Sequence, residues 1–273
     1  MTYKLAVIGV GNMAKSIIAG IVNSNTLVSE LIVYDSFPSQ YDTLPKEKGS
    51  FLYASSIADA VREADCVLLS VKPQNYDEVL TEIQAVNDHA KKLYISIGAG
   101  ITAQSVSSCL GDACVIRVLP NIPMLIGEGV SIICKNEKAR AEEFEFVCEV
   151  FRSSGSILLI EESEMNRMIG VTSSSPAYVF QFIQSIYQGA LAQDLPDREL
   201  LDAICDVVIG TARLLKSSDD TPEEWITKVA SKGGTTERAL AKLKEYRFDE
   251  AIKKAMMACT ARADELGELR DKK

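Results

Sequence analysis

The stretch Leu5-Ala6-Val7-Ile8-Gly9-Val10-Gly11-Asn12-Met13-Ala14 decides the fold. A short apolar run meets a turn with two glycines, and residues 12–22 then repeat apolar side chains at helical spacing. A strand, a glycine-rich turn and a helix in this order are the dinucleotide-binding fingerprint. Gly9 is expected to make the tight turn, and Gly11 to let a pyrophosphate approach the backbone. Asn12 and Met13 open the helix, whose free N–H groups attract phosphates.

An acidic residue follows the next apolar run. Asp35 comes directly after residues 31–34, where a carboxylate can bond both ribose hydroxyls of NAD and repel the 2′-phosphate of NADP. Residues 36–42 contain no Arg, which an NADP-binding enzyme usually carries there. The sequence therefore predicts a nicotinamide cofactor, NADH or NADPH, with NADH favoured by Asp35. The structural alternative is that Asp35 only caps a turn.

The first half of the chain alternates apolar strands with helices of 3.6-residue period. The predicted strands are 5–8, 31–34, 51–53, 66–71, 94–97, 114–119, 130–134 and 156–160, and the predicted helices are 12–22, 57–63, 76–86 and 138–152. Near-continuous apolar strands separated by helices indicate a parallel sheet covered on both faces. The predicted fold class is α/β, with a doubly wound, Rossmann-like parallel sheet.

After about residue 163 no further strand is predicted. Ser175 is expected to cap a long helix over 177–191, Thr221 and Glu224 form a capping box, and helices are predicted over 200–215, 236–246 and 248–266. The first of these helices is apolar on nearly every face and needs cover from a second subunit. We predict a dinucleotide-binding domain over 1–162, and an all-helical domain for dimerisation and substrate binding over 163–273.

Two more segments follow strands at the edge where open parallel sheets bind ligands. Val71, Lys72 and Pro73 end one strand, and Gly98 and Ala99 end the next. We expect both segments to lie along the cofactor, and the glycine at the second to allow close approach of the nicotinamide half. The structural alternative is a proline that stops a strand beside a surface lysine.

A pair of glycines lies between two predicted helices, in Ser231-Lys232-Gly233-Gly234-Thr235-Thr236. Adjacent glycines expose consecutive backbone N–H groups, and Thr236 is expected to start the following helix. Such a nest suits a substrate carboxylate. A plain turn between helices, with a threonine as N-cap, explains the spacing equally well.

The chain resembles the pyrroline-5-carboxylate reductase family over nearly its whole length. The motifs that carry the resemblance match in order and spacing and lie at 8–14, 70–75, 96–102, 117–123, 173–180 and 231–236. The resemblance implies reduction of the cyclic imine 1-pyrroline-5-carboxylate to L-proline, the last step of proline biosynthesis. It also implies an intertwined homodimer through the C-terminal helices, often assembled into a decamer of five dimers.

The resemblance also assigns roles to single residues. By the resemblance, Gly9, Gly11, Asn12 and Met13 would cradle the pyrophosphate. Substrate binding falls to Glu162, Ser231, Gly233, Gly234, Thr235 and Thr236. The backbone N–H groups of Gly233, Gly234 and Thr235 would hold the carboxylate. Thr236 would be the catalytic residue, bonding the imine nitrogen, and Glu162 would lie near the nitrogen side of the ring.

Three residues depart from the family pattern. Ser173 and Ser175 replace glycines, and Lys232 replaces a proline beside the carboxylate nest. A different small imine or an oxo acid is therefore an alternative substrate, and a non-catalytic nucleotide-binding relative is an alternative function. A 3-hydroxyacid dehydrogenase usually needs a lysine in the helix around 166–190, which contains none.

Composition excludes several other classes. The chain has 273 residues with 29 basic and 38 acidic side chains, a net charge of −9 that disfavours binding to nucleic acid or anionic membranes. With seven cysteines, no C-x-x-C pair and the single histidine His89, no metal site is predicted. No run of 18 apolar residues and no cleavable signal is present. We predict a cytoplasmic protein that acts on a small molecule.

Overall fold

The structure is a computed structural model that describes residues 2–24, 27–45 and 51–271. The chain forms two compact units. Met1–Pro176 and Met257–Lys273 make up the sheet unit, and Ala177–Met256 make up the helical unit. The boundary predicted between residues 162 and 163 separates a cofactor-binding part from a substrate-binding part. It stays a prediction. Throughout the described ranges, no helix has the length and apolar composition needed to cross a bilayer.

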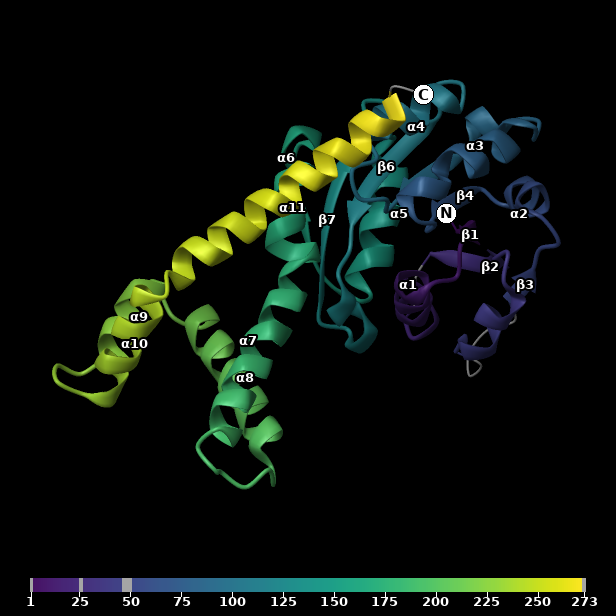
Figure 1. The fold of residues 1–273 in the computed structure, drawn as a ribbon. Helices are drawn as coiled ribbons and strands as arrows, with labels where there is room; N and C mark the ends of the chain where they lie inside the picture. The colour runs from purple at the N-terminus through teal and green to yellow at the C-terminus, as the bar shows by residue number, and fades with distance from the viewer. Residues whose placement is uncertain (1, 25–26, 46–50, 272–273) are drawn as a thin grey trace. The chain divides into compact units, whose positions relative to one another are not determined.

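An eight-stranded sheet forms the centre of the sheet unit, in the order β3-β2-β1-β4-β5-β6-β7-β8 (Figure 1). The strands are β1 (Tyr3–Ile8), β2 (Val28–Tyr34), β3 (Phe51–Tyr53), β4 (Cys66–Leu69), β5 (Leu93–Ser96), β6 (Cys114–Leu119), β7 (Gly129–Lys135) and β8 (Gly155–Leu159). Strands β1 to β6 all run parallel. The strand order reverses between β1 and β4, the switch point at which doubly wound sheets bind ligands. The predicted fold class is confirmed.

Strand β7 runs antiparallel to β6, a reversal that the sequence patterns did not predict. The connection from Leu119 to Gly129 contains only the short 3-10 helix η4 (Ile122–Ile126). A parallel crossover needs a dozen or more residues, so this short connection forces the chain to turn back. Strand β8 then pairs parallel with β7.

The other regular elements of the described residues are helices. In the sheet unit they are α1 (Asn12–Val22), α2 (Ile57–Glu63), α3 (Tyr76–Gln84), α4 (Ala103–Cys109), α5 (Ala141–Arg152) and α6 (Glu162–Met168), with 3-10 helices η1 (Pro38–Thr43), η2 (Pro73–Asn75) and η3 (His89–Lys91). The later helices are α7 (Ser175–Leu191), α8 (Leu200–Lys216), α9 (Pro222–Val229), α10 (Thr235–Glu245) and α11 (Phe248–Asp271). Helix α11 begins in the helical unit and ends in the sheet unit.

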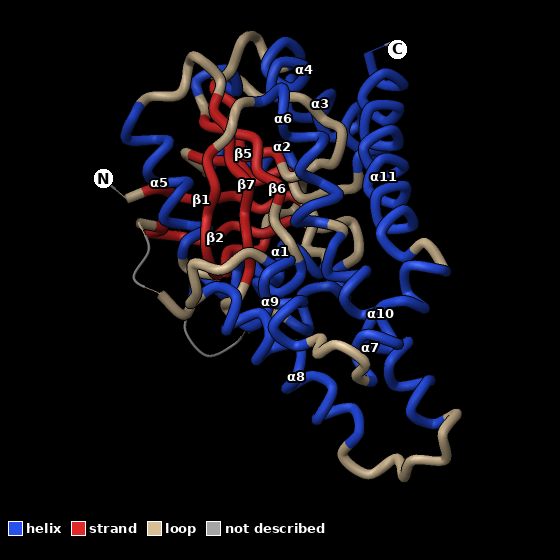
Figure 2. Tube along the Cα trace, turned by 90° about the vertical axis from the view of Figure 1, so that its left-hand side faces the viewer, coloured by secondary structure: helices blue, strands red, loops and turns tan. Residues whose placement is uncertain are grey.

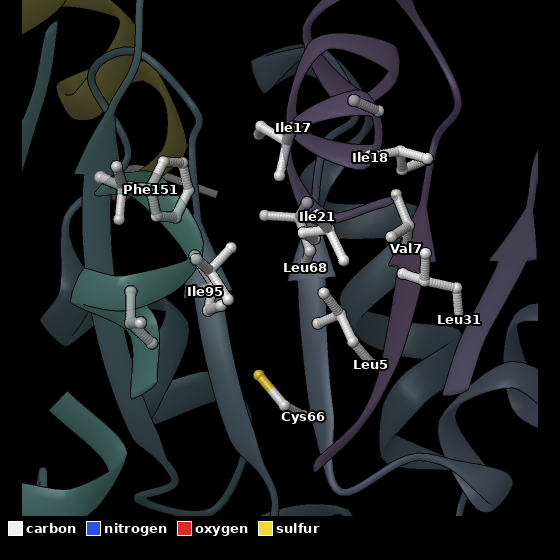
Figure 3. Close-up of a cluster of buried hydrophobic side chains, with 14 of the residues drawn as sticks. Leu5, Val7, Ile17, Ile18, Ile21, Leu31, Cys66, Leu68, Ile95 and Phe151 are labelled. Carbon is white, nitrogen blue, oxygen red and sulfur yellow. The ribbon is translucent and has the colours of Figure 1, made fainter. Parts of the chain in front are cut away.

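Both faces of the sheet are buried at its central strands. Successive side chains of a strand point to opposite faces, and in β1 they belong to two different buried clusters. Leu5 and Val7 of β1 belong to one cluster, together with apolar side chains of α1 and α5 (Figure 3). Ala6 and Ile8 belong to a second cluster, with side chains of α2, α3 and α4. Figure 2 shows helices on either side of the strands. This double cover explains why the strands lack polar alternation.

The start of α7 differs from the prediction. A π-helical turn at Ile169–Ser173 follows α6 directly, and Ser174 N donates to the carbonyl oxygen of Ile169 at 2.8 Å. The Ser175 hydroxyl donates to the carbonyl oxygen of Val171 at 2.6 Å, so the N-cap role predicted for Ser175 is wrong. The capping box of α9 is confirmed, because Thr221 and Glu224 each accept from the backbone N–H of the other.

Candidate active site

A pocket of about 310 Å³ opens at the carboxyl edge of the sheet. Five residues predicted from separate motifs line it: Gly9, Gly11, Asp35, Val71 and Lys72. They follow β1, β2 and β4, which are neighbours in the sheet. The sheet topology therefore brings these residues, which come from three separate segments of the sequence, together at the switch point.

The two glycines of the first turn differ in what surrounds them. Gly9 has a φ of +89°, and a Cβ added there would lie 2.8 Å from the carbonyl oxygen of Ser70. Gly11 is the N-cap of α1, and no atom lies within 4 Å of the position of its missing Cβ. The first turn of α1, which Asn12 and Met13 open, carries no acidic side chain. Gly9 is thus required by packing, whereas the space beside Gly11 is open to an anion.

The Asp35 carboxylate connects the glycine turn to the end of β2. Its Oδ2 accepts from Val10 N at 2.6 Å, and its Oδ1 accepts from Phe37 N at 2.8 Å. Asp35 therefore caps this turn, which is the structural alternative given for it in the sequence. Each carboxylate oxygen has two acceptor positions, so these bonds leave room for the hydroxyls of a ribose.

The second pair of predicted segments lies at the ends of β4 and β5. Lys72 precedes η2 and is exposed, while Pro73 begins η2. Gly98 donates its N–H to the hydroxyl of Tyr76 at 3.0 Å. Ala99 packs against the cluster that contains Leu119. Pro73, Gly98 and Ala99 are not among the residues that line the pocket.

Glu162 lies at the start of α6 and already has partners in the sheet unit. Its Oε1 accepts from Ala103 N at 2.6 Å and lies 3.4 Å from the guanidinium of Arg117. Arg117 is only 1% exposed and donates a second bond to Asn166 Oδ1 at 2.6 Å. Sequence reasoning missed this role for Arg117. The signal was there, because a single charged residue inside an apolar strand needs buried partners.

The glycine pair of the helical unit forms a turn before α10. Helix α10 begins at Thr235 with Gly234 as N-cap, so the start predicted at Thr236 is one residue late. Gly233 N donates to the Glu237 carboxylate at 2.7 Å, and Gly234 N donates to Ser231 O at 3.0 Å. A carboxylate of the chain itself thus occupies part of the predicted nest. Lys232 and Thr235 are exposed, and Thr236 is half-buried.

Two known protein families match parts of the chain. Residues 162–266 match the family described as pyrroline-5-carboxylate reductase dimerisation, and residues 4–100 match one described as NADP oxidoreductase, coenzyme F420-dependent. The chain is 33% identical over 270 residues to the pyrroline-5-carboxylate reductase of Vibrio alginolyticus, with 97% of this chain and 98% of the relative covered. It is 31% identical over 268 residues to that of Escherichia coli (strain K12), with 97% and 99% covered.

Solved structures agree with the sequence comparisons. The 1-pyrroline-5-carboxylate reductase of Streptococcus pyogenes matches with a TM-score of 0.87 and 27% identity, over 97% of this chain and 99% of the other. The pyrroline carboxylate reductase of Plasmodium falciparum with NADP bound matches with a TM-score of 0.85 and 25% identity, over 97% and 98%.

Proposed function

This chain belongs to the pyrroline-5-carboxylate reductase family, and we propose that it reduces 1-pyrroline-5-carboxylate to L-proline with a nicotinamide cofactor. The observation that carries the proposal is the similarity over the full length of relatives with that name, above 30% identity. The pocket at the switch point supports it, because a glycine turn, a helix N-terminus and Asp35 converge there.

The residues around this pocket fit a dinucleotide. The open space beside Gly11 and the first turn of α1, free of acidic side chains, suit a pyrophosphate. When bound, the nicotinamide ring supplies a hydride for the imine carbon. We assign cofactor binding to the domain 1–162, through Gly9, Gly11, Asn12, Met13, Asp35, Val71, Lys72, Pro73, Gly98 and Ala99.

We assign substrate binding to Glu162 and to the domain 163–273. The backbone N–H groups of Gly233, Gly234 and Thr235 hold the substrate carboxylate, next to Ser231. The Thr236 hydroxyl orients the imine nitrogen. A protonated cyclic imine is already electrophilic at carbon, so the chain needs no strong acid and works by placing and orienting the substrate.

Glu237 competes with the substrate for the nest in this proposal, since its carboxylate accepts from Gly233 N. We expect Glu237→Gln to lower the KM for pyrroline-5-carboxylate by about fivefold, because a charged acceptor binds an N–H about twice as strongly as a neutral one. Steady-state kinetics measure this effect, with kcat unchanged. Glu245→Gln removes the same charge at the far end of α10 and serves as control. A higher KM for Glu237→Gln would show that Glu237 supports the turn instead.

We propose NADH as the preferred cofactor. The negative charges near the end of β2 support this preference: the pKa of the Tyr34 phenol is raised first by burial and then by neighbours that include the carboxylates of Glu82, Asp35 and Glu78. Tyr34, Asp35, Glu78 and Glu82 all line the pocket. A 2′-phosphate placed there would be repelled.

Removing the charge of Asp35 tests this preference. Asp35→Asn keeps an oxygen that can accept from Val10 N, and we expect it to raise the ratio of kcat/KM for NADPH to that for NADH about tenfold, or 1.4 kcal/mol. Asp42→Asn makes the same change outside the residues that line the pocket and serves as control. An unchanged ratio in Asp35→Asn would contradict the assignment of the ribose to Asp35.

The chain is a homo-oligomer in this proposal, and we assign its homodimer interface to the C-terminal helices. In the single chain α7 has no buried residue, and Val179, Phe180 and Phe182 are exposed. A second copy would cover this surface, and a ring of five such dimers gives the decamer that the family resemblance implies. All seven cysteines are free, as in a reducing compartment, and we propose a cytoplasmic location.

The substrate is tested by following NADH oxidation with pyrroline-5-carboxylate beside other cyclic imines and 2- and 3-oxo acids. We expect pyrroline-5-carboxylate to give the highest kcat/KM. Turnover of an oxo acid alone would identify a different reductase, for which Lys232, Ser173 and Ser175 are the first residues to examine. Binding of NADH without turnover of any of these compounds would indicate a non-catalytic relative.

A further inference from the structure

One buried tyrosine joins the ends of two neighbouring strands. Tyr76, the first residue of α3, is 1% exposed, and its hydroxyl donates to the carbonyl oxygen of Leu69 at 3.0 Å. Gly98 N donates to the same hydroxyl at 3.0 Å, and Ser96 Oγ lies 3.1 Å from it. A phenol has one donor and two acceptor positions, so these three contacts use all of them.

The hydroxyl lies next to two segments assigned to the cofactor, residues 71–73 and residues 98–99, and the second of these is assigned to its nicotinamide half. Leu69 and Ser96 are the last residues of β4 and β5 and are register partners in the sheet. Residues 71–73 connect β4 toward Tyr76, and Gly98 comes two residues after Ser96. A Cβ at Gly98 would lie 2.8 Å from the Tyr76 hydroxyl oxygen, so the ring packs directly against this backbone.

The loop that follows β5, residues 97–102, leads to Ala103, where other elements also hold the backbone. Ala103 N donates to Glu162, which Arg117 contacts in turn, and Asn166 links Arg117 to Asp264 of α11 through bonds of 2.6 and 2.7 Å. Between the two ends, a side chain at Gly100 would collide with the backbone of α11. The backbone of this loop is therefore held by hydrogen bonds at Gly98 and at Ala103.

We infer that Tyr76 is a positioning residue for the nicotinamide half of the cofactor. Its hydroxyl joins the end of β4 at Leu69 to Gly98, and it acts through the backbone of Gly98 rather than by touching the reacting atoms. The inference rests on the proposed function only in assigning the Gly98 segment to the nicotinamide half of the cofactor. The inference predicts a result that a merely structural tyrosine would not give. Loss of the hydroxyl must weaken the binding of NADH, which contains the nicotinamide, and not the binding of ADP-ribose, which lacks it.

The chain offers a matched control in Tyr94. This residue of β5 is fully buried, and its hydroxyl donates to the carbonyl oxygen of His89 at 2.9 Å, before the amino end of the strand. Tyr94→Phe therefore removes a buried tyrosine hydrogen bond of the same kind, at the edge of the sheet opposite to the pocket. Any general cost of losing such a bond applies to both variants.

The experiment titrates purified full-length Tyr76→Phe and Tyr94→Phe with NADH and with ADP-ribose, which lacks the nicotinamide. We expect Tyr76→Phe to raise the Kd for NADH about tenfold, as loss of one well-placed hydrogen bond would, and to leave the Kd for ADP-ribose unchanged. Tyr94→Phe should leave both values unchanged. Should Tyr76→Phe not fold, Ser96→Ala loosens the same hydroxyl and should show a smaller loss with the same selectivity.

Equal weakening of NADH and ADP-ribose, or equal behaviour of the two tyrosine variants, would overturn the inference. The titration does not depend on turnover. A wild-type protein that binds NADH and reduces no imine would contradict the proposed reaction, while the comparison of the variants would still decide the role of Tyr76. A wild-type protein that binds neither NADH nor NADPH would overturn both.

Discussion

Gly11→Ala is expected to keep the fold and lose the cofactor. No atom lies within 4 Å of the Cβ position, and the backbone of Gly11, with φ of −76° and ψ of −177°, suits any residue. Alanine at an N-cap costs about 1 kcal/mol of stability. The new methyl group would occupy the space in which a pyrophosphate meets the backbone. We expect the Kd for NADH to rise at least about a hundredfold, or 2.7 kcal/mol.

Titration with NADH and thermal unfolding together measure this result, and Gly9→Ala gives the contrast. Gly9 has a φ of +89° and a neighbouring carbonyl oxygen 2.8 Å from its Cβ position, so alanine there strains the backbone and collides with Ser70. We expect that variant to lose a few kcal/mol of stability together with the cofactor. A Gly11→Ala protein that binds NADH like the wild type would place the pyrophosphate elsewhere.

Thr236→Ala is expected to reduce turnover with little effect on cofactor binding. Thr236 lies half-buried in the first turn of α10, where alanine favours the helix. Loss of its hydroxyl would leave the imine nitrogen unoriented, and we expect kcat/KM for pyrroline-5-carboxylate to fall about a hundredfold. The Kd for NADH should stay within about twofold of the wild type, a change of 0.4 kcal/mol.

Thr235→Ala is the matched control for this prediction. Thr235 is exposed and is assigned to the substrate only through its backbone N–H, which alanine retains. We expect its kcat/KM to remain near the wild-type value. If Thr236→Ala instead lost NADH and kept its turnover per bound cofactor, the role assigned to Thr236 would be wrong.

Local patterns were enough to predict the sheet. A strand buried on both faces is a continuous apolar run, so residues 66–69 and 114–119 stand out between amphipathic helices. The reversal at β7 depends on the length of a connection, a signal that hydrophobic periodicity does not contain. The π-helical turn that links α6 to α7 likewise has no periodic pattern of its own.

The candidate site was predictable where a motif is contiguous. Gly9 and Gly11 belong to one fingerprint, and Asp35 stands at its usual distance from them. The contacts of Tyr76 with Gly98 and of Arg117 with Glu162 join residues 22 and 45 positions apart. Such pairs depend on which elements meet in the folded chain. The sequence indicates that a charged Arg117 inside an apolar strand needs partners, but it does not identify them.

Transfer of deuterium tests the central claim most directly. The protein would be incubated with pyrroline-5-carboxylate and NADH that carries deuterium at both hydrogen positions of C4 of its nicotinamide, and the product would be examined by NMR. The account requires L-proline with one deuterium at C5, formed in step with the oxidation of NADH. Formation of no proline, or of proline without deuterium while NADH is consumed, would contradict it.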